Sequence, residues 1–542
     1  MRKYLVYRIA ILSLLLIIGS QYYSNTLRTA DSLKRMAPNN NEFILTGKFL
    51  TINNPDQNIE AIYIKDEKIQ DIGTKEEIFS LYKYKAPITV KSMGSNTILP
   101  GIIDGHTHVI GNTWEDGYDI AEAQYLALSN GFTTISEKFA HQDLIDALRE
   151  AEAKGELKLR VNIFPSYNDA ILDEERKNII LETWFPENQP ILNNSKLVRI
   201  PGIKIFVDGA FIPERGMWAV SNPYSEEMKA YISEFYPEEL INDYGDLYWE
   251  QDTLNQVVKL AQDRGFRVAF HAMGDRAIET TLNAIEYALE GNSNAEYRHQ
   301  IEHNSYVRPD MVPRYQELDV LTSVRGYYPA CAQSEYLEFF NDTADWNVRR
   351  YQLPNIVSYS YLETDYPYGP INPFTHLFGL VTRTGIHENG TLCEPMDWVK
   401  KYEITVEKAL EIMTIGGAYA VSQEEYLGTI EKNKYADLIV VSESPTEISP
   451  ENLKDITVLL TMVGGKIVYQ NEDFTWEESQ LTQSVSTPET SSTTEHSTTT
   501  DKSSTTTESS TITPSWTFPG LLVVLIALRK VKRLIKRPKG KL

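Results

Sequence analysis

The stretch ILPGIIDGHTHVIG, residues 98–111, constrains this chain more than any other feature. A short apolar run rich in β-branched residues ends in two histidines, His106 and His108, that one residue separates. Residues i and i+2 of a strand point to the same side, so both imidazoles are expected to leave the end of one buried strand together. Neutral imidazole nitrogens that converge in this way suit a divalent metal. The stretch therefore predicts a metal site at the end of a buried strand.

From residue 98 onward, strand-like runs alternate with helical ones, which predicts parallel βα units. Eight strand segments can be counted, at residues 98–108, 132–140, 159–167, 202–209, 267–274, 297–304, 320–328 and 356–365. Eight such units suggest an α/β fold with a (β/α)8 barrel of TIM type over residues 98–425. Shorter strands in residues 43–97 and 426–475 predict a small β-sandwich domain formed by the two flanks of the barrel.

Both ends of the 542-residue chain predict membrane association. Residues 1–24 start with basic residues and continue apolar, as a signal peptide or N-terminal anchor does. Residues 483–514 are rich in Ser and Thr and predict a disordered stalk. Residues 515–534 then predict a transmembrane or sorting segment, which overlaps a basic cytoplasmic tail at 529–542. We therefore expect an exported protein, anchored at the extracellular face of the cell membrane.

The formal net charge is -23, which argues against nucleic acid as a partner because phosphate binding requires a basic face. The chain has two cysteines, Cys331 and Cys393. They could form one disulfide, but two thiols are too few to indicate a disulfide framework, and the sequence leaves their pairing open.

In (β/α)8 barrels the chemistry gathers at the carboxyl ends of the strands. The candidate metal ligands at these ends are His106, His108, Lys204, His271, His303 and Asp365. Such a set can hold two divalent ions, with the strand-one histidines and Asp365 around the deeper ion and His271 and His303 around the outer one. Asp365 is also the candidate catalytic residue, a general base that takes a proton from water and passes it to the leaving nitrogen.

Each of these residues has a structural alternative. A buried lysine is costly without a partner, and Lys204 could instead snorkel or pair with Asp208. Asp365 could form a turn before Pro367. We expect Glu137, in the second strand segment, to be a solvated or structural carboxylate near the same rim.

The strand-end motifs resemble those of the amidohydrolase superfamily. The branch is the amidohydrolase-3 group, which includes YtcJ-like and N-substituted formamide deformylase-like hydrolases. The matching motifs are LPGIIDGHTH, GIKIFVDGAF, VAFHAMGDRAIETTLNAIE, YRHQIEH and TDYP. The resemblance covers about residues 43–470, and the motifs occur in the family's order.

The resemblance implies a metal-dependent hydrolase that cleaves an amide or other non-peptide C–N bond of a small-molecule substrate by attack of a metal-bound hydroxide. It also implies two divalent ions, expected to be zinc, that a carbamylated Lys204 bridges. Arg215 stands in a loop where the family often places a substrate-contacting residue. Strand eight departs from the usual SDxP, since it reads Glu363-Thr364-Asp365-Tyr366-Pro367, and the substrate pocket is expected to differ there.

Two other functions remain open. A one-metal deaminase of the same superfamily would need the HxH pair, one more histidine and the aspartate, but no bridging lysine. A non-catalytic surface binding protein on the same barrel would need none of the six ligands.

Overall fold

The computed structural model describes residues 42–53, 58–85, 87–111, 119–167, 187–211, 215–327, 330–387 and 389–482. The predicted signal peptide or anchor, the stalk, the transmembrane or sorting segment and the basic tail lie outside the described residues. The domain boundaries drawn from the sequence stay predictions.

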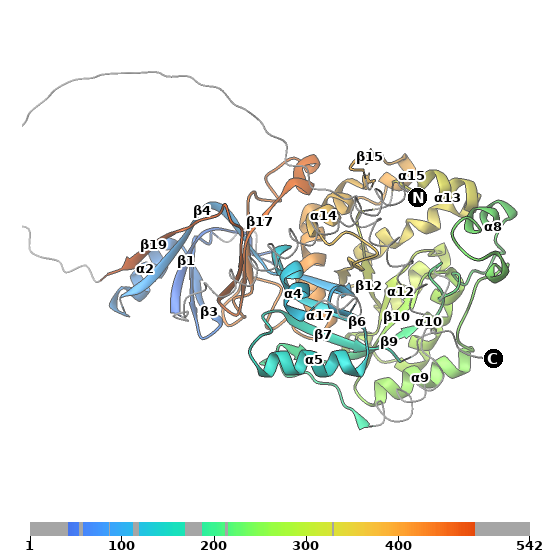
Figure 1. The fold of residues 1–542 in the computed structure, drawn as a ribbon, viewed down its shortest axis with the longest axis horizontal. Coiled ribbons are helices and arrows are strands. Elements are labelled where there is room, and N and C mark those ends of the chain that lie inside the picture. The colour runs from blue at the N-terminus through green and yellow to red at the C-terminus, as the bar shows by residue number, and fades with distance from the viewer. Residues whose placement is uncertain are drawn as a thin grey trace, which may run out of the picture.

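Strands from the two flanks form one mixed sheet of eight strands, on the left of Figure 1. They are β1 (Glu42–Phe49), β2 (Ala61–Lys65), β3 (Lys68–Gly73), β4 (Ile88–Pro100), β16 (Leu438–Val441), β17 (Val458–Val463), β18 (Lys466–Gln470) and β19 (Glu477–Leu481). Strand β4 pairs with β1 in parallel and with β16 and β19 antiparallel, so it joins the early and late parts of the chain. Hydrogen bonds link all eight strands in one sheet, and the predicted two-layered β-sandwich stays a prediction.

The strands between the two flanks, apart from the small hairpin of β14 (Gly385–Ile386) and β15 (Leu392–Cys393), form two parallel sheets. The first contains β5 (Ile102–Thr107), β6 (Phe132–Ala140), β7 (Arg160–Pro165) and β8 (Val198–Arg199). The second contains β9 (Gly202–Phe206), β10 (Arg267–Ala272), β11 (Gln300–His303), β12 (Leu321–Val324) and β13 (Ser360–Leu362). Each of the eight strand segments predicted from the sequence contains one of these strands.

The predicted first strand began too early. Residues 98–100 belong to β4, where Ile98 and Leu99 pair with β16 of the flanking sheet. The apolar run continues across Gly101 from one strand into the next, so hydropathy alone does not separate them.

The two parallel sheets are connected at both margins. A parallel bridge joins Ser166, after β7, to Lys204 in β9. On the other side, the backbone N–H of Asp365, beyond β13, donates to the carbonyl of His106 in β5 over 2.9 Å. The result is a TIM-barrel-like α/β arrangement, on the right of Figure 1.

Gly105 allows strands β5 and β13 to approach each other. A Cβ at this position would lie 2.1 Å from Cδ2 of Tyr361. Any larger residue would therefore push apart the strands that carry His106 and Asp365.

Helices cover the parallel strands. The longer ones are α4 (Ile120–Ser129), α5 (Gln142–Ala153), α9 (Gln251–Asp263), α10 (Asp275–Leu289), α13 (Gln333–Phe340) and α14 (Pro373–Thr382). The shorter ones are α8 (Glu226–Ile232), α11 (Asn294–Tyr297), α12 (Val312–Leu318), α15 (Asp397–Lys400), α16 (Val406–Glu411) and α17 (Gly417–Ala420). Helix α2 (Lys75–Tyr82) packs instead on β1 and β2 of the flanking sheet. In α9 the buried face is Leu254, Val258 and Ala261, at helical spacing. Burying the Leu or the Val side chain contributes about 1.5–3 kcal/mol each.

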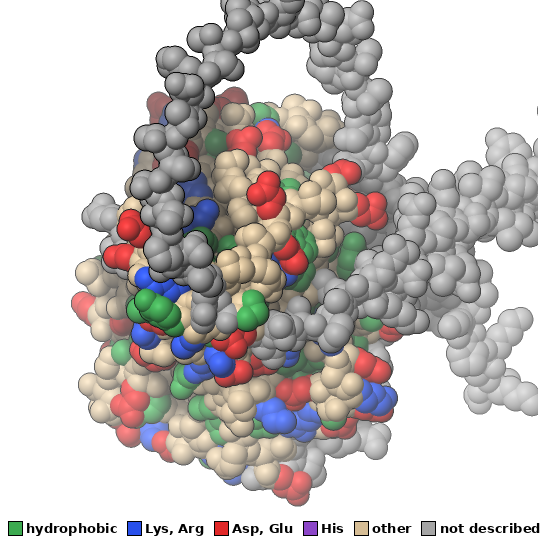
Figure 2. All heavy atoms as spheres, turned by 90° about the vertical axis from the view of Figure 1, so that its left-hand side faces the viewer, with side chains coloured by type: hydrophobic (Ala, Val, Ile, Leu, Met, Phe, Trp, Pro, Cys, Tyr) green, Lys and Arg blue, Asp and Glu red, His purple; other side chains and the backbone are tan. Residues whose placement is uncertain are grey.

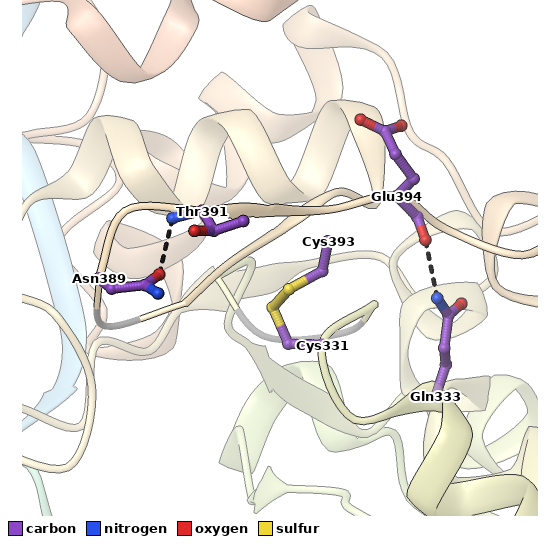
Figure 3. Close-up of a disulfide and its surroundings, with 6 residues drawn as sticks. All are labelled: Cys331, Gln333, Asn389, Thr391, Cys393 and Glu394. Carbon is purple, nitrogen blue, oxygen red and sulfur yellow. Dashed lines mark hydrogen bonds between the residues drawn. A yellow bond between two sulfur atoms is a disulfide. The ribbon is translucent and has the colours of Figure 1, made fainter.

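Cys331 and Cys393 form a disulfide (Figure 3). It connects the segment after β12 to the small hairpin of β14 (Gly385–Ile386) and β15 (Leu392–Cys393). Nearby, the side-chain amide of Gln333 donates to the carbonyl of Glu394 over 2.7 Å. The pairing that the sequence left open is therefore present, and it fixes a loop on the side of the barrel where β12 ends.

Acidic and basic side chains are interspersed on the face shown in Figure 2. Some of them form exposed ion pairs on the flanking sheet, such as Lys466 with Glu67 at 2.9 Å. Solvated pairs contribute about 0–1 kcal/mol each, so this surface adds little to stability.

The prediction of a membrane-anchored, cell-surface protein needs correction. Within the part of the chain that the structure describes, no helix combines the length and the apolar character that crossing a bilayer requires. The prediction rested on the two terminal apolar segments, which are not among the described residues.

Candidate metal centre

The end of β5 brings His106 and His108 together. His106 is 1% exposed, and His108 follows directly after the strand. Their Nε2 atoms lie 3.3 Å apart. The alternation of side chains along a strand is therefore the local cause of this convergence, as the spacing predicted.

Asp365 reaches the same point from beyond β13. Its Oδ1 atom lies 3.4 Å from Nε2 of His106 and 3.2 Å from Nε2 of His108. The residue has a left-handed backbone (φ 51°), and its N–H bonds to the carbonyl of His106. Main-chain contacts thus set the position of this carboxylate against the two imidazoles. We call His106, His108 and Asp365 the inner group.

Buried carboxylates face the other nitrogen of each imidazole. Nδ1 of His106 lies 3.2 Å from Oε2 of Glu302, and Nδ1 of His108 lies 3.7 Å from Oε1 of Glu137. Neither Nδ1 atom has a well-aligned hydrogen bond, so these are charge contacts rather than ideal bonds. Carboxylates behind metal-ligating histidines hold the ring orientation that leaves Nε2 for the ion.

Electrostatics separate the two histidines. Burial lowers the pKa of His106 to about 3, so this imidazole is neutral at pH 7. Burial opposes protonation of His108 as well, but the carboxylates of Asp365 and Glu137 outweigh it and raise the pKa to about 9. The Arg325 guanidinium holds the pKa of Asp365 well below its ordinary value although burial acts in the opposite direction.

The inner group fits the geometry of a tetrahedral ion. Ligand atoms about 2.0–2.1 Å from such an ion lie about 3.3–3.4 Å from one another. The three separations among Nε2 of His106, Nε2 of His108 and Oδ1 of Asp365 are 3.3, 3.4 and 3.2 Å. These residues therefore fit a divalent metal without moving, and the ion would displace the proton that the raised pKa keeps on His108.

His271, His303 and Lys204, which we call the outer group, lie beside the inner group. The ring centroids of His271 and His303 are 4.5 Å apart, and those of His303 and His106 are 4.8 Å apart. Their polar atoms, however, have protein partners. Nε2 of His271 lies 3.2 Å from the carbonyl oxygen of Gly209, and Lys204 contacts Glu302.

Glu363 contacts the outer histidine His303. Its Oε1 atom lies 2.7 Å from Nδ1 of His303, and the two residues with His106 form a second cluster whose ligand atoms lie within 4.8 Å of one another. Arg325 contacts the same carboxylate, and its Nη2 lies 2.9 Å from Oδ2 of Asp365. One guanidinium thus connects the inner carboxylate to the outer cluster.

A third cluster consists of Cys331, His387 and Cys393. Its two sulfur atoms are bonded to each other in the disulfide, so they are not thiolate ligands.

Comparisons with known proteins agree with this geometry. Residues 115–469 match the amidohydrolase family model of the amidohydrolase-3 branch. This chain belongs to the amidohydrolase family. The resemblance drawn from the strand-end motifs is therefore confirmed, and with it a hydrolase of a metal-dependent family.

Two curated amidohydrolase relatives are each 24% identical to the chain. They are the YtcJ amidohydrolase of Bacillus subtilis, matched over 50% of this chain and 48% of the relative, and the N-substituted formamide deformylase of Arthrobacter pascens, matched over 45% of each. The chain spans about half the length of the curated relatives it matches. A metal-dependent hydrolase from Pyrococcus furiosus shares the fold, with a TM-score of 0.59, 19% identity, and coverage of 75% of this chain and 100% of that one.

The alternative partner of Lys204 in this amidohydrolase was wrong. Asp208 instead accepts backbone N–H groups of Ala219, Met273 and Gly274 over 2.8–2.9 Å. The side chain of Lys204 in β9 pairs instead with Glu302 in β11, two strands away in the same sheet.

Arg215, the candidate substrate-contacting residue, lies against two aromatic rings. Its guanidinium carbon is 4.4 Å from the ring centroid of Phe206 and 4.7 Å from that of Phe139. It lies close enough to His271 to lower the pKa of that imidazole, although burial is the larger cause.

Sequence reasoning missed four charged residues of the site. They are Lys138, Glu302, Arg325 and Glu363. Of the two alternatives for Glu137, the structural one holds, because its side chain is fully buried and accepts the N–H groups of Ile110 and Gly111. The sequence did carry a signal for Lys138 and Glu302, which stand within the apolar strands β6 and β11. A charged residue in a buried strand needs a partner.

Proposed function

We propose that this amidohydrolase cleaves an amide or other non-peptide C–N bond of a small-molecule substrate. The observation that carries the proposal is the convergence of three ligand atoms, Nε2 of His106, Nε2 of His108 and Oδ1 of Asp365, at the spacing of a tetrahedral ion. Family membership supports the same reaction class.

A divalent ion in the inner group, zinc by the chemistry of its ligands, would lower the pKa of a water and polarise the substrate carbonyl. His106 and His108 present Nε2 toward this point, and Glu302 and Glu137 stand behind their Nδ1 atoms. Asp365 is the catalytic residue. Its carboxylate takes the proton of the attacking water as the O–C bond forms, and it returns that proton to the nitrogen as the C–N bond breaks.

We further propose that Lys204 is carbamylated and would bridge the ion of the inner group to a second ion. His271 and His303 would be the other ligands of that second ion. Support comes from the burial of Lys204 and from the short spacing of the imidazole rings of His271, His303 and His106. In this arrangement Arg215 contacts the substrate, since its guanidinium lies over the ring of Phe206 and close to His271.

The same proposal includes a closed barrel of eight parallel strands. The bridge between Ser166 and Lys204 and the hydrogen bond from Asp365 to His106 support it, because they connect the two parallel sheets at both margins.

A one-metal deaminase is the second candidate. The observation that favours it is that the inner group alone has its ligand atoms converged, while His271 and Lys204 have protein partners. One ion per chain, with hydrolysis of amino-substituted rings retained by Lys204→Ala, would select this alternative.

Metal analysis together with a substrate panel tests the proposal. We expect two zinc ions per chain, loss of hydrolysis with a chelator, recovery on adding zinc, and loss of both metal and activity in His106→Ala. The first substrates are N-substituted formamides, which the name of the Arthrobacter pascens relative suggests.

His387→Ala is the matched control, because His387 is exposed and lies outside the inner and outer groups. It should keep the metal and the activity of the unaltered protein. Metal-loaded protein that hydrolyses no amide, formamide, lactam or ester would contradict the proposed reaction.

A further inference from the structure

Lys138 is a second buried lysine in the interior of the parallel strands. It lies in β6, its side chain is fully buried, and its Nζ is 3.1 Å from Oε1 of Glu302. Lys204, in β9, contacts Oε2 of the same carboxylate. One carboxylate thus stands between two ammonium groups, one on each of its oxygens.

The surroundings of Lys138 fix its position. Nζ also donates to Oε1 of Gln300 over 3.1 Å and lies 3.4 Å from the ring centroid of Phe164. Burial lowers the pKa of Lys138 to about 8, although the contact with Glu302 acts in the opposite direction. An ammonium group in such a place is costly, so a structural pair alone would be served better by apolar side chains.

The charge balance changes if Lys204 is carbamylated. The neutral amine attacks carbon dioxide, a new N–C bond forms, and one proton leaves for solvent, so an ammonium cation becomes a carbamate anion. Glu302 then has an anion beside Oε2 in place of its cation. Two anions at contact distance in a buried site repel each other strongly unless a cation remains.

We propose that Lys138 is a positioning residue that keeps Glu302 paired and thereby lets Lys204 carry the carbamate. The inference rests on the carbamylation of Lys204 that we propose above. Lys138 acts in two ways. It shares Glu302 with Lys204, which weakens the hold of the carboxylate on the free ammonium group, and it is the cation that remains when the carbamate has formed.

The same contact reaches the inner group through Glu302. Oε2 of Glu302 faces Nδ1 of His106 over 3.2 Å, while Oε1 faces Lys138. Lys138 therefore also holds the carboxylate that keeps the imidazole of His106 directed toward His108 and Asp365.

Carbon-13 NMR of the zinc-loaded full chain in 13C-bicarbonate tests the inference. The unaltered protein should give one carbamate resonance that Lys204→Ala lacks. Lys138→Met and Lys138→Gln remove the charge and should reduce the resonance at least tenfold, with zinc falling from two ions to one. Lys138→Arg keeps the charge and should keep most of the resonance.

A charge-compensating variant separates this role from a merely structural one. Adding Glu302→Gln to Lys138→Met removes the anion beside the carbamate and should restore the resonance above that of Lys138→Met alone. Circular dichroism checks the fold of each variant before the resonances are compared, because the double variant leaves the Lys204 ammonium group without its carboxylate partner until the carbamate forms.

The outcomes are distinct. Absence of the resonance from the unaltered protein refutes carbamylation itself, and the role of Lys138 fails with it. A resonance of unaltered size in folded Lys138→Met or Lys138→Gln refutes only the role of Lys138. If the carbamate resonance is lost in Lys138→Arg as completely as in Lys138→Met, Lys138 has a packing role and the inference is overturned. The same holds if the resonance does not recover in the double variant.

Discussion

The inner and outer groups of the site differ in how the protein holds them. In the inner group, His106, His108 and Asp365 converge at ligand spacing, and main-chain bonds between β5 and the end of β13 fix them. In the outer group, His271 and Lys204 contact Gly209 and Glu302 instead of a common point. The difference teaches that backbone geometry preorganises a place for a first ion, whereas binding of a second ion would require side chains to leave existing partners.

The largest effect is expected from Asp365→Asn, which breaks the inner group while keeping its shape. The amide cannot accept the proton of the attacking water, and it is a poorer ligand than the carboxylate. We expect kcat to fall about a thousandfold or more. Steady-state kinetics on the best formamide or amide substrate measures this, and a variant that keeps a tenth of the activity would exclude Asp365 as the base.

Lys204→Ala should separate the two groups. It removes the bridging ligand but leaves the three side chains of the inner group, so the inner ion should remain while the outer one is lost. We expect hydrolysis to fall on the order of a hundredfold, because one stabilising group for the reacting carbonyl disappears. Zinc counted per chain by mass spectrometry measures the metal, and loss of both ions from a folded variant would contradict the separation.

Glu302→Gln and Glu363→Gln form a matched pair of smaller changes. Glu302 faces Nδ1 of the inner His106, and Glu363 faces Nδ1 of the outer His303. Removing a carboxylate behind a metal-ligating histidine weakens metal binding about 10–100-fold. Titration with buffered zinc should show weakened inner binding for the first variant and weakened outer binding for the second. Equal effects on both ions would remove the distinction between the groups.

The smallest effect on the site is expected from the double variant Cys331→Ser and Cys393→Ser. The disulfide closes a loop of 62 residues, so its loss should cost about 2–4 kcal/mol of unfolding free energy. Zinc content and kcat should stay unchanged, because neither cysteine belongs to the inner or outer group. Denaturant unfolding measures the first expectation, and a loss of zinc would show that this loop supports the ligands.

The order of the strands and the inner group were predictable because local rules govern them. Two-residue alternation brought His106 and His108 together, and the strand-end rule brought Asp365 to them. The contact between Glu302 and Lys138 was not predictable from the sequence. The two residues lie in different parallel sheets, and no local pattern in either strand indicates its partner in the other strand. His303 shows a further limit: its left-handed backbone (φ 70°) departs from strand alternation, so adjacent Glu302 and His303 both face the site.

The contact between the first and last parallel strands determines when the inner group can form during synthesis. Asp104 and Thr364, 260 residues apart in sequence, hydrogen-bond beside the site, and Asp365 and His106 are their neighbours. During synthesis, the ribosome must therefore add residue 365 before the inner group can exist. Metal uptake by nascent chains of increasing length would therefore begin only once Asp365 can reach the two histidines.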